Sequence, residues 1–352
     1  MKNAIRNTRY AIHAMQSSAQ NNIAESNLVI PFYETVRFEL DRVKQLINEQ
    51  LFFSSRGRRN PNLDKLLESL RNRSGKMIRP GLVLLTGKYY NNITEKHIST
   101  AACIEMVHHA TLLHDDVIDD GLKRRGKPTI NSLWGNESAV LLGDFLLSHV
   151  FKLSSELDPK VIKVVADSSV RLCEGELRQI VQKDNWQISE SEYISVITEK
   201  SAALFSNSCY LGAVLAQDDE NQAKLFSDFG LNAGIAFQIT DDLLDIVGDE
   251  KRTGKTVGKD ADKHKPTLAV IHLLNSVNES AREELIETYL NDDNEKKEEF
   301  IEKLKNTGSL EYASKQAQKY VLKAIQALDL LPQNQTKHTL IETAKFMANR
   351  TS

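Results

Sequence analysis

The chain is short of the residues that interrupt helices and close turns. Its 352 residues include 16 glycines and seven prolines, about half the ~12% share that these two residues usually have together. A β protein built on tight turns needs more of both, so the composition favours long uninterrupted helices. The three cysteines lie far apart and lack the spacing of a zinc site. We expect Cys103, Cys173 and Cys209 to be buried apolar residues in a reducing compartment, the cytoplasm.

An excess of charge of one sign and a long apolar run are also missing. Lysine and arginine number 45 against 48 aspartates and glutamates, so the basic excess of a nucleic-acid-binding protein is absent. No apolar run approaches the ~18 residues of a membrane-spanning helix. We therefore expect neither a nucleic-acid partner nor a transmembrane segment. Residues 1–25 read as a polar extension, and the lack of acidic residues before Glu25 leaves an organelle transit peptide as the alternative.

What is present is helical periodicity. Apolar residues recur every three or four positions in the segments 145–157, 161–180, 193–216 and 225–246, which predicts long amphipathic helices. The segment 101–113 is almost wholly apolar or small, as in a helix buried on most sides. A stripe that includes Val36, Phe38 and Val43 predicts another helix near the N-terminus. We predict an all-α fold in a single domain spanning 1–352, interrupted by a basic, glycine-containing, lid-like loop at 248–265.

Two aspartate trios with the same spacing close two of these apolar helices. They are Asp115, Asp116 and Asp119, and Asp241, Asp242 and Asp245. Positions i, i+1 and i+4 of a helix fall within an arc of about 100°, so each trio shares one face. Neighbouring carboxylates repel, and burial raises their pKa values unless a cation holds them. Such oxygen ligands select Mg²⁺, with Mn²⁺ as the alternative. The two trios predict a clamp for a metal-bound diphosphate.

Three basic groups would complete such a site, because a diphosphate also needs protein cations. A lysine and an arginine precede a predicted helix, whose N-terminal amides attract anions. Two arginines follow the first trio, and further lysines lie in the 248–265 loop. These residues are Lys76 and Arg79, Arg124 and Arg125, and Lys255, Lys259 and Lys265. Each alone is commonly a surface charge, and only their joint presence with the aspartates indicates a site.

A longer series of motifs surrounds these residues. In chain order they are Gly-Lys-x-x-Arg-Pro at 75–80, Glu105 to His108, the first aspartate motif at 115–119, Arg-Arg-Gly-Lys-Pro-Thr at 124–129, Gly-Asp-Phe-Leu at 143–146, Gly-Glu-Leu at 175–177, Lys-Ser-Ala-Ala-Leu-Phe at 200–205, the second aspartate motif at 238–245, and Lys-Pro-Thr-Leu at 265–268. With this series the chain resembles the trans-isoprenyl diphosphate (polyprenyl) synthases, in particular the long-chain octaprenyl and solanesyl type. The resemblance covers roughly residues 75–268.

The resemblance implies an antiparallel helix bundle around a deep central cavity, usually as a homodimer. It also implies a reaction: head-to-tail condensation of isopentenyl diphosphate onto an allylic diphosphate such as farnesyl diphosphate, by ionisation, condensation and elimination. No side-chain nucleophile is needed, and the 248–265 loop would help to exclude water. Release of a long apolar product raises the expectation of peripheral membrane contact.

The resemblance further assigns residues to roles. Those implied to hold Mg²⁺ on the allylic diphosphate are Asp115, Asp116, Asp119, Asp241, Asp242 and Asp245. Those implied to contact that diphosphate are Arg124, Lys200, Lys255 and Lys265. Those implied to hold the diphosphate of isopentenyl diphosphate are Lys76, Arg79, His108 and Arg125. Gln238 and Ser201 are implied to line the reacting region, where Ser201 keeps the hydroxyl of the threonine that the family often has.

Product length is partly readable from the residues below the first trio. Ala110 and Thr111 precede Asp115 by five and four positions, and Val107 lies one turn further down. Family members that make short products resemble one another in having bulky aromatic residues there. One isoprene unit extends about as far as one 5.4 Å helical turn, so the small residues predict a product of roughly six to ten units, as in quinone side chains. The alternative is that a floor elsewhere stops the chain.

Two other functions fit part of the pattern. A terpene cyclase uses the same ionisation but needs no second diphosphate site, which Lys76, Arg79 and Arg125 indicate here. A non-catalytic partner subunit of a heteromeric synthase is expected to have an eroded aspartate motif, whereas both motifs are intact. Turnover by the purified chain alone discriminates between these functions.

Overall fold

The predicted all-α fold is confirmed. The computed structural model describes residues 31–53, 61–71, 75–124, 126–247, 265–291 and 293–349. Within these ranges the only strands are two of two residues each, which pair as one antiparallel hairpin. The elements are α2 (Phe32–Phe53), α3 (Pro61–Arg71), α4 (Ile78–Tyr89), α5 (Glu95–Ile118), β1 (Lys123–Arg124), β2 (Lys127–Pro128), α6 (Ile130–Trp134), α7 (Asn136–Ser154), α8 (Pro159–Val181), α9 (Glu190–Ile197), the π-helical segment η2 (Thr198–Ala202), α10 (Ala203–Ala216), α11 (Glu220–Val247), α14 (Leu268–Asn275), α15 (Glu279–Tyr289), α16 (Asn294–Asn306), α17 (Ser309–Ala327) and α18 (Gln335–Ala348).

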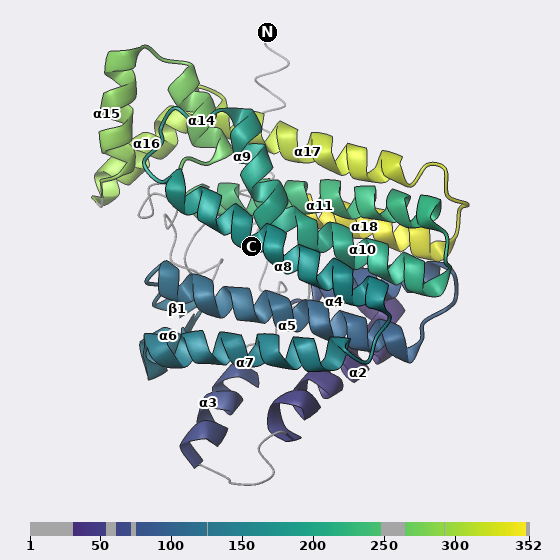
Figure 1. The fold of residues 1–352 in the computed structure, drawn as a ribbon. Coiled ribbons are helices and arrows are strands. Elements are labelled where there is room, and N and C mark those ends of the chain that lie inside the picture. The colour runs from purple at the N-terminus through teal and green to yellow at the C-terminus, as the bar shows by residue number, and fades with distance from the viewer. Residues whose placement is uncertain are drawn as a thin grey trace, which may run out of the picture.

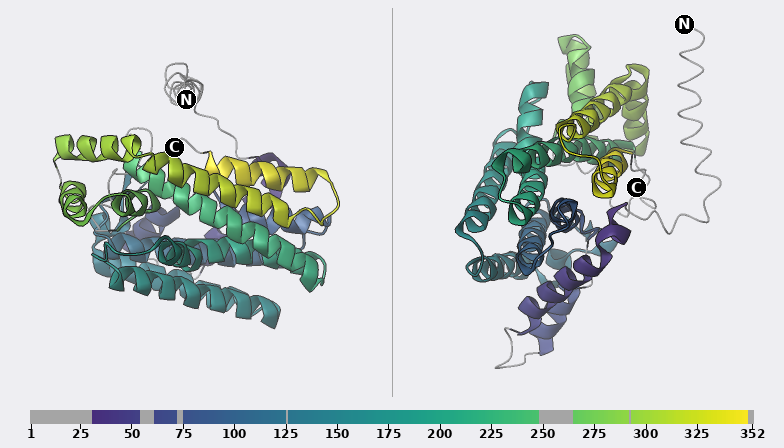
Figure 2. Two further views of the ribbon diagram at one scale, coloured as in Figure 1. Left: turned by 90° about the horizontal axis from the view of Figure 1, so that it is seen from above. Right: turned by 90° about the vertical axis from the view of Figure 1, so that its right-hand side faces the viewer.

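The long helices pack side by side in a bundle (Figure 1). Helix α5 contacts both α7 and α4, α4 contacts α10, and α11 lies between α10 and α17. Figure 2 shows that α7 and α8 lie on one side of the bundle while α17 and α18 lie on the other. The short helices α14, α15 and α16 cluster at one end, beyond the end of α9.

The core follows from the apolar composition of the central helices. In α5, residues Ala101 to Ile104 are fully buried, as the sequence predicted. Helix α10 is likewise almost entirely buried along its length. Burial of apolar surface is the main favourable term in folding, so a helix with no polar face lies inside the bundle. The first aspartate motif therefore lies at the end of a rigidly packed helix.

Most predicted helices are confirmed, and some predicted side-chain positions are wrong. The segment 193–216 is helical but is interrupted by η2. Phe38, expected on the buried stripe of the N-terminal helix, is 74% exposed because it lies on the opposite face from Val36 and Val43. Cys103 and Cys209 are buried as predicted, but Cys173 is exposed on the outer face of α8.

Two further predictions concern the N-terminal extension and membrane-spanning helices. The polar extension 1–25 lies outside the described residues. Among the helices that are described, none combines the length and the apolar character needed to span a membrane.

Candidate active site

The first aspartate motif forms the C-terminal end of α5. Asp115 is half-buried, Asp116 is only 6% exposed, and Asp119 is the residue that caps the helix. The Asp119 N–H donates to the Asp115 carbonyl at 2.8 Å. Asp120 then adopts a left-handed conformation (φ 47°), which ends the helix. The chain leaves α5 in a sharp turn with the carboxylates gathered at its end.

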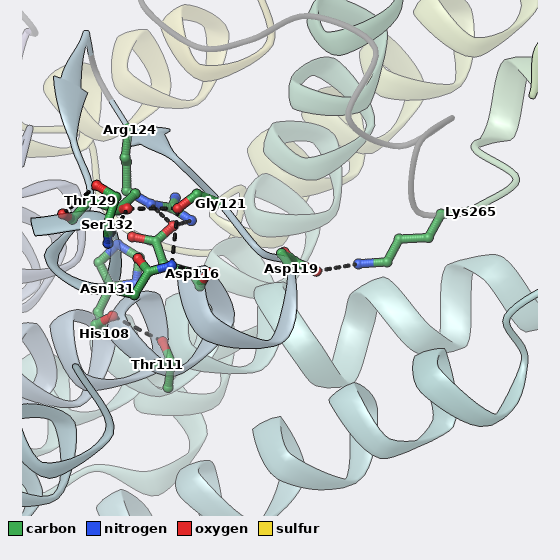
Figure 3. A network of polar contacts seen from close by, with 10 residues as sticks. All are labelled: His108, Thr111, Asp116, Asp119, Gly121, Arg124, Thr129, Asn131, Ser132 and Lys265. Atoms are coloured by element: carbon green, nitrogen blue, oxygen red, sulfur yellow. Dashed lines mark hydrogen bonds and ion pairs between the residues drawn. The ribbon is translucent and has the colours of Figure 1, made fainter. Parts of the chain in front are cut away.

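The hairpin β1–β2 brings an arginine back to this motif. Arg124 Nε donates to Asp116 Oδ1 at 2.9 Å, and Arg124 Nη2 lies 2.8 Å from the same oxygen (Figure 3). The turn is anchored beneath them, since Asn131 Nδ2 donates to the Asp116 carbonyl at 3.1 Å and Thr129 Oγ1 donates to the Gly121 carbonyl at 2.6 Å. Two residues predicted for different roles, a metal ligand and a diphosphate ligand, thus form an ion pair.

A second cation reaches the motif from far along the chain. Lys265 Nζ lies 3.5 Å from Asp119 Oδ1 (Figure 3). Tyr289 Oη donates to the backbone carbonyl of Lys265 at 3.1 Å and so ties this residue to α15. The remainder of the predicted lid, 248–264, lies outside the described residues together with Lys255 and Lys259, as does Arg125.

The π-helical segment η2 carries Lys200 and Ser201. Lys200 Nζ forms an ion pair with Glu176 and donates to Gln179 Oε1 at 2.8 Å. Both partners lie on α8, where Gly175 allows very close packing: a Cβ on Gly175 would be 2.7 Å from the Lys200 backbone nitrogen. π-Helical turns often occur at functional sites. The sequence places Glu176 in a motif without indicating its partner, and nothing in the sequence marks Gln179.

Ser201 faces the second aspartate motif. Its hydroxyl donates to Gln238 Oε1 at 2.7 Å, and Gln238 Nε2 in turn donates to Asp242 Oδ1 at 2.7 Å. The other oxygen of Asp242 accepts a 2.5 Å hydrogen bond from Tyr193 Oη. These bonds connect α9, η2 and α11. Tyr193 was not predicted, because nothing in its local sequence marks a partner 49 residues away.

The π-helical segment lies between the two motifs. Burial raises the pKa of Asp115 to about 6, the positive charge of Lys200 opposes that rise, and the negative charges of Glu176 and Asp119 add to it. For Lys200, burial lowers the pKa, but the negative charges of Asp115 and Glu176 outweigh it and raise the pKa. Lys200 is therefore charged and close to the first motif, while its neighbour Ser201 is bonded to the second. Asp241 and Asp245 are half-buried on the same helix as Gln238.

The residues predicted to bind the second diphosphate lie at the start of α4 and on α5. Lys76 is exposed, and its carbonyl accepts from Tyr33 Oη at 2.6 Å. Met77 adopts φ 49° just before α4 begins, so Arg79 lies in the first helical turn. The Arg79 guanidinium carbon lies 4.2 Å from the centre of the Phe205 ring on α10. His108 is half-buried and lies on α5 among the residues predicted to control product length, directly after Val107.

Those product-length residues line α5 below the first motif. Ala110 and Val107 are buried, and Thr111 is half-buried with its hydroxyl donating to the His108 carbonyl at 2.9 Å (Figure 3). The two positions that precede Asp115 by five and four residues, Ala110 and Thr111, therefore carry small side chains.

The donor set around the motifs consists of carboxylates. Among the described residues, no group of three or more histidine, cysteine, aspartate or glutamate side chains is arranged to hold a metal ion alone. Carboxylate oxygens suit a hard divalent cation such as Mg²⁺ better than zinc, because Mg²⁺ keeps several waters and binds through one or two carboxylates together with substrate phosphates.

Comparisons with known proteins find related sequences and structures. The family model described as Polyprenyl synthetase matches residues 60–306. The octaprenyl diphosphate synthase of Escherichia coli is 35% identical over 279 residues, covering 78% of this chain and 86% of that protein. A short chain isoprenyl diphosphate synthase of Methanothermobacter thermautotrophicus is 35% identical over 288 residues, covering 80% of this chain and 89% of that protein. A solved structure of a polyprenyl synthase from Caulobacter crescentus, complexed with calcium and isoprenyl diphosphate, has a TM-score of 0.85 at 30% identity and covers 93% of this chain and 99% of its own.

Proposed function

The chain belongs to the polyprenyl synthetase family, whose members are prenyltransferases that elongate isoprenyl diphosphates, and from that premise we propose its substrates, metal and product. It condenses isopentenyl diphosphate head-to-tail onto an allylic diphosphate such as farnesyl diphosphate. Mg²⁺ is the metal, with Mn²⁺ as the alternative. The product is a long-chain all-trans polyprenyl diphosphate for quinone side chains. The observation that carries the proposal is the position of η2, where Lys200 pairs with Glu176 and its positive charge opposes the rise that burial causes in the pKa of Asp115, while Ser201 is bonded to Gln238.

The first step is loss of the allylic diphosphate. The allylic C–O bond breaks, both electrons leave with the diphosphate, and a delocalised carbocation remains. Fixed positive charges aimed at the leaving oxygens lower the barrier of such a step. Arg124, Lys265 and Lys200 supply them, each now held by a carboxylate, with Lys255 proposed from the sequence. When bound, Mg²⁺ neutralises further charge on the leaving group.

Six carboxylates are proposed to hold the metal at the two motifs. They are Asp115, Asp116, Asp119, Asp241, Asp242 and Asp245. Asp115 supports this role, because burial raises its pKa to about 6 and a bound cation would relieve the cost of its charge. Both carboxylate oxygens of Asp242 already accept hydrogen bonds, one from Tyr193 and one from Gln238.

The second step joins the two substrates. The double bond of isopentenyl diphosphate attacks the allylic carbon, and a proton is then lost to the released diphosphate, so that no side-chain base is needed. Lys76, Arg79, His108 and Arg125 are proposed to hold the diphosphate of isopentenyl diphosphate. Ser201 and Gln238 line the reacting region, and their mutual hydrogen bond fixes the Gln238 amide.

A long product is proposed from α5. The small residues Ala110 and Thr111 and the aliphatic Val107 put no aromatic floor beneath the first motif. Relatives of the long-chain and short-chain types match this chain about equally well, so overall identity does not decide the length. A floor formed by other residues is the alternative.

A homodimer is part of the proposal. Helices α7 and α8 lie on the side that faces the viewer in Figure 1, and each exposes apolar side chains: Val140, Leu141 and Phe151 on α7, and Val170, Leu177, Ile180 and Val181 on α8. Large exposed apolar patches mark interaction sites, and a second copy related by a two-fold axis would cover such a face with the same face. A cytoplasmic location and peripheral membrane contact during product release belong to the same proposal. The cytoplasmic location rests on the three cysteines, which form no disulfide.

One experiment tests the function. Purified protein is incubated with Mg²⁺, labelled isopentenyl diphosphate and farnesyl diphosphate, and the dephosphorylated products are separated by length. A ladder that ends well past four isoprene units is the expected result. A stop at three or four units, also with shorter primers, keeps the reaction but contradicts the long product. No incorporation by the chain alone favours a non-catalytic partner subunit, and a cyclised hydrocarbon favours a terpene cyclase. Asp115→Ala and Asp241→Ala serve as controls that should abolish turnover.

A further inference from the structure

The buried ring of Phe205 has no role in the reaction described so far. It lies under the guanidinium of Arg79, with the Arg79 carbon 4.2 Å from the ring centre. We propose that Phe205 is a positioning residue whose ring holds Arg79 in place for the diphosphate of isopentenyl diphosphate. This inference rests on the proposed role of Arg79.

The surroundings of Phe205 keep its ring in one place. Phe205 is fully buried in the first turn of α10, directly after the segment that carries Lys200. Its ring packs against Phe237 with 5.2 Å between the ring centres. Helix α11 presses on its backbone, because a Cβ on Gly230 would be only 2.5 Å from the Phe205 carbonyl oxygen. The ring is therefore a fixed platform, and it belongs to the same stretch of chain that approaches both aspartate motifs.

The chemistry of the contact suits an arginine that must bind a ligand. The electron-rich face of an aromatic ring attracts a guanidinium within about 6 Å. This attraction uses none of the five N–H donors, which lie in the guanidinium plane and match a phosphate group. Phe205 restrains Arg79 without competing for the ligand.

A double-mutant cycle tests the inference. The KM values for isopentenyl diphosphate and for farnesyl diphosphate are measured separately in wild type, Phe205→Leu, Arg79→Ala and the double variant. Phe205→Leu should raise the KM for isopentenyl diphosphate about tenfold, the order expected when a partly desolvated cation–π contact is lost, and should leave the KM for farnesyl diphosphate within about twofold. In the Arg79→Ala background the same substitution should have no further effect.

The possible outcomes separate the two claims. If Arg79→Ala leaves the KM for isopentenyl diphosphate unchanged, the proposed role of Arg79 is wrong. If Arg79→Ala raises that KM but Phe205→Leu has equal effects in both backgrounds, Arg79 keeps its role and Phe205 only fills space. Phe226→Leu is the matched control, since Phe226 is also fully buried but packs against Tyr89 rather than against Arg79; the KM for isopentenyl diphosphate should not change.

A second measurement avoids any folding defect of Phe205→Leu. Phe205 is replaced with phenylalanine analogues that carry one, two or three ring fluorines, which weaken the negative ring face with little change of shape. The KM for isopentenyl diphosphate should rise with each added fluorine. A KM that does not vary across the series overturns the inference.

Discussion

At the scale of single residues, a histidine far from the aspartates connects α5 to α10. His97 is fully buried. Its Nδ1 accepts from the Thr94 backbone N–H at 3.1 Å, and its Nε2 lies 3.0 Å from the Gly212 carbonyl oxygen. Only the neutral ring with its proton on Nε2 satisfies both partners. Burial lowers the pKa of His97 below its ordinary value.

This histidine predicts a stability loss in mild acid. Below pH ~6.5, the ordinary value for histidine, the unfolded chain binds a proton at His97 that the folded chain does not bind. The free energy of unfolding therefore falls as the pH decreases from about 6.5 towards the lowered pKa of the folded state. Denaturant unfolding at pH 8 and pH 5.5 should show a larger fall for wild type than for His97→Gln. An equal fall in both proteins would mean that other groups cause the acid sensitivity.

A second prediction at this scale concerns product length. Ala110→Tyr places a ring one turn below the first motif, where α5 is buried. If the growing chain descends there, the product should shorten to about three or four isoprene units while the KM for isopentenyl diphosphate stays near wild type. Product analysis by chain length checks this, and Leu322→Tyr on the exposed face of α17 is the control. An unchanged product would move the floor to another helix.

The residue types of the candidate site were predictable, but most of their partners were not. Paired carboxylates after an apolar run can be recognised from spacing alone, and both trios were found in this way. The contacts of Tyr193 with Asp242 and of Gln179 with Lys200 join residues 49 and 21 positions apart, and no local pattern encodes them. Cys173 was misjudged because a small apolar residue is as acceptable on an exposed apolar face as in a core.

At the scale of elements, the contact between α8 and η2 controls the position of Lys200. Gly175 lies against the Lys200 backbone, and an added Cβ would be 2.7 Å from its nitrogen, so Gly175→Ala must push the two segments apart. A displacement of about 1 Å in a positioning group can reduce the rate about a hundredfold. We expect such a loss in kcat for Gly175→Ala with an unchanged circular dichroism spectrum.

Glu174→Ala is the matched control for this prediction, since Glu174 is exposed on the same helix. Its kcat should equal that of wild type. A wild-type kcat for Gly175→Ala would show that the spacing of α8 and η2 is unimportant for Lys200.

Apolar periodicity alone does not predict the interruption of the 193–216 helix. Apolar periodicity reports which face is buried, and one extra residue in a turn hardly changes that pattern. The ion pair of Arg171 with Glu199, with Nε to Oε2 at 2.6 Å, and the close packing of Gly175 are tertiary contacts that support the π-helical turn. In retrospect, the polar pair Lys200–Ser201 within an apolar segment was the available signal.

At the scale of the whole molecule, the apolar side formed by α7 and α8 predicts the oligomeric state. Leu141 on α7 is 66% exposed, and Leu141→Asp would bury a charge in the proposed dimer interface. Sedimentation should give a dimer for wild type and a monomer for Leu141→Asp. Leu330→Asp is the control, because Leu330 is 83% exposed on the loop after α17; it should remain dimeric. A wild-type monomer would contradict the proposed interface.

The fold class followed from composition, whereas the arrangement did not. Scarce glycine and proline and uninterrupted 3.6-residue periodicity require helices, and a helix such as α5 with no polar face must be central. The order of packing around α5 depends on which surfaces fit together, and no single helix contains that information. Phe38 marks the limit at the level of side chains, since it fits the apolar stripe by type but not by direction.

The ion pairs around the first motif have a consequence for how a charged substrate enters. Arg124 is matched by Asp116, Lys265 by Asp119 and Lys200 by Glu176. A magnesium diphosphate also carries its own opposite charges, so on its arrival Asp116 and Asp119 would turn to the metal, while Arg124, Lys265 and Lys200 would turn to the phosphates. Each charged side chain exchanges one charged partner for another, so few mobile ions are released to the solvent. We therefore expect the affinity for magnesium diphosphate to depend only weakly on salt, in contrast to an open basic surface.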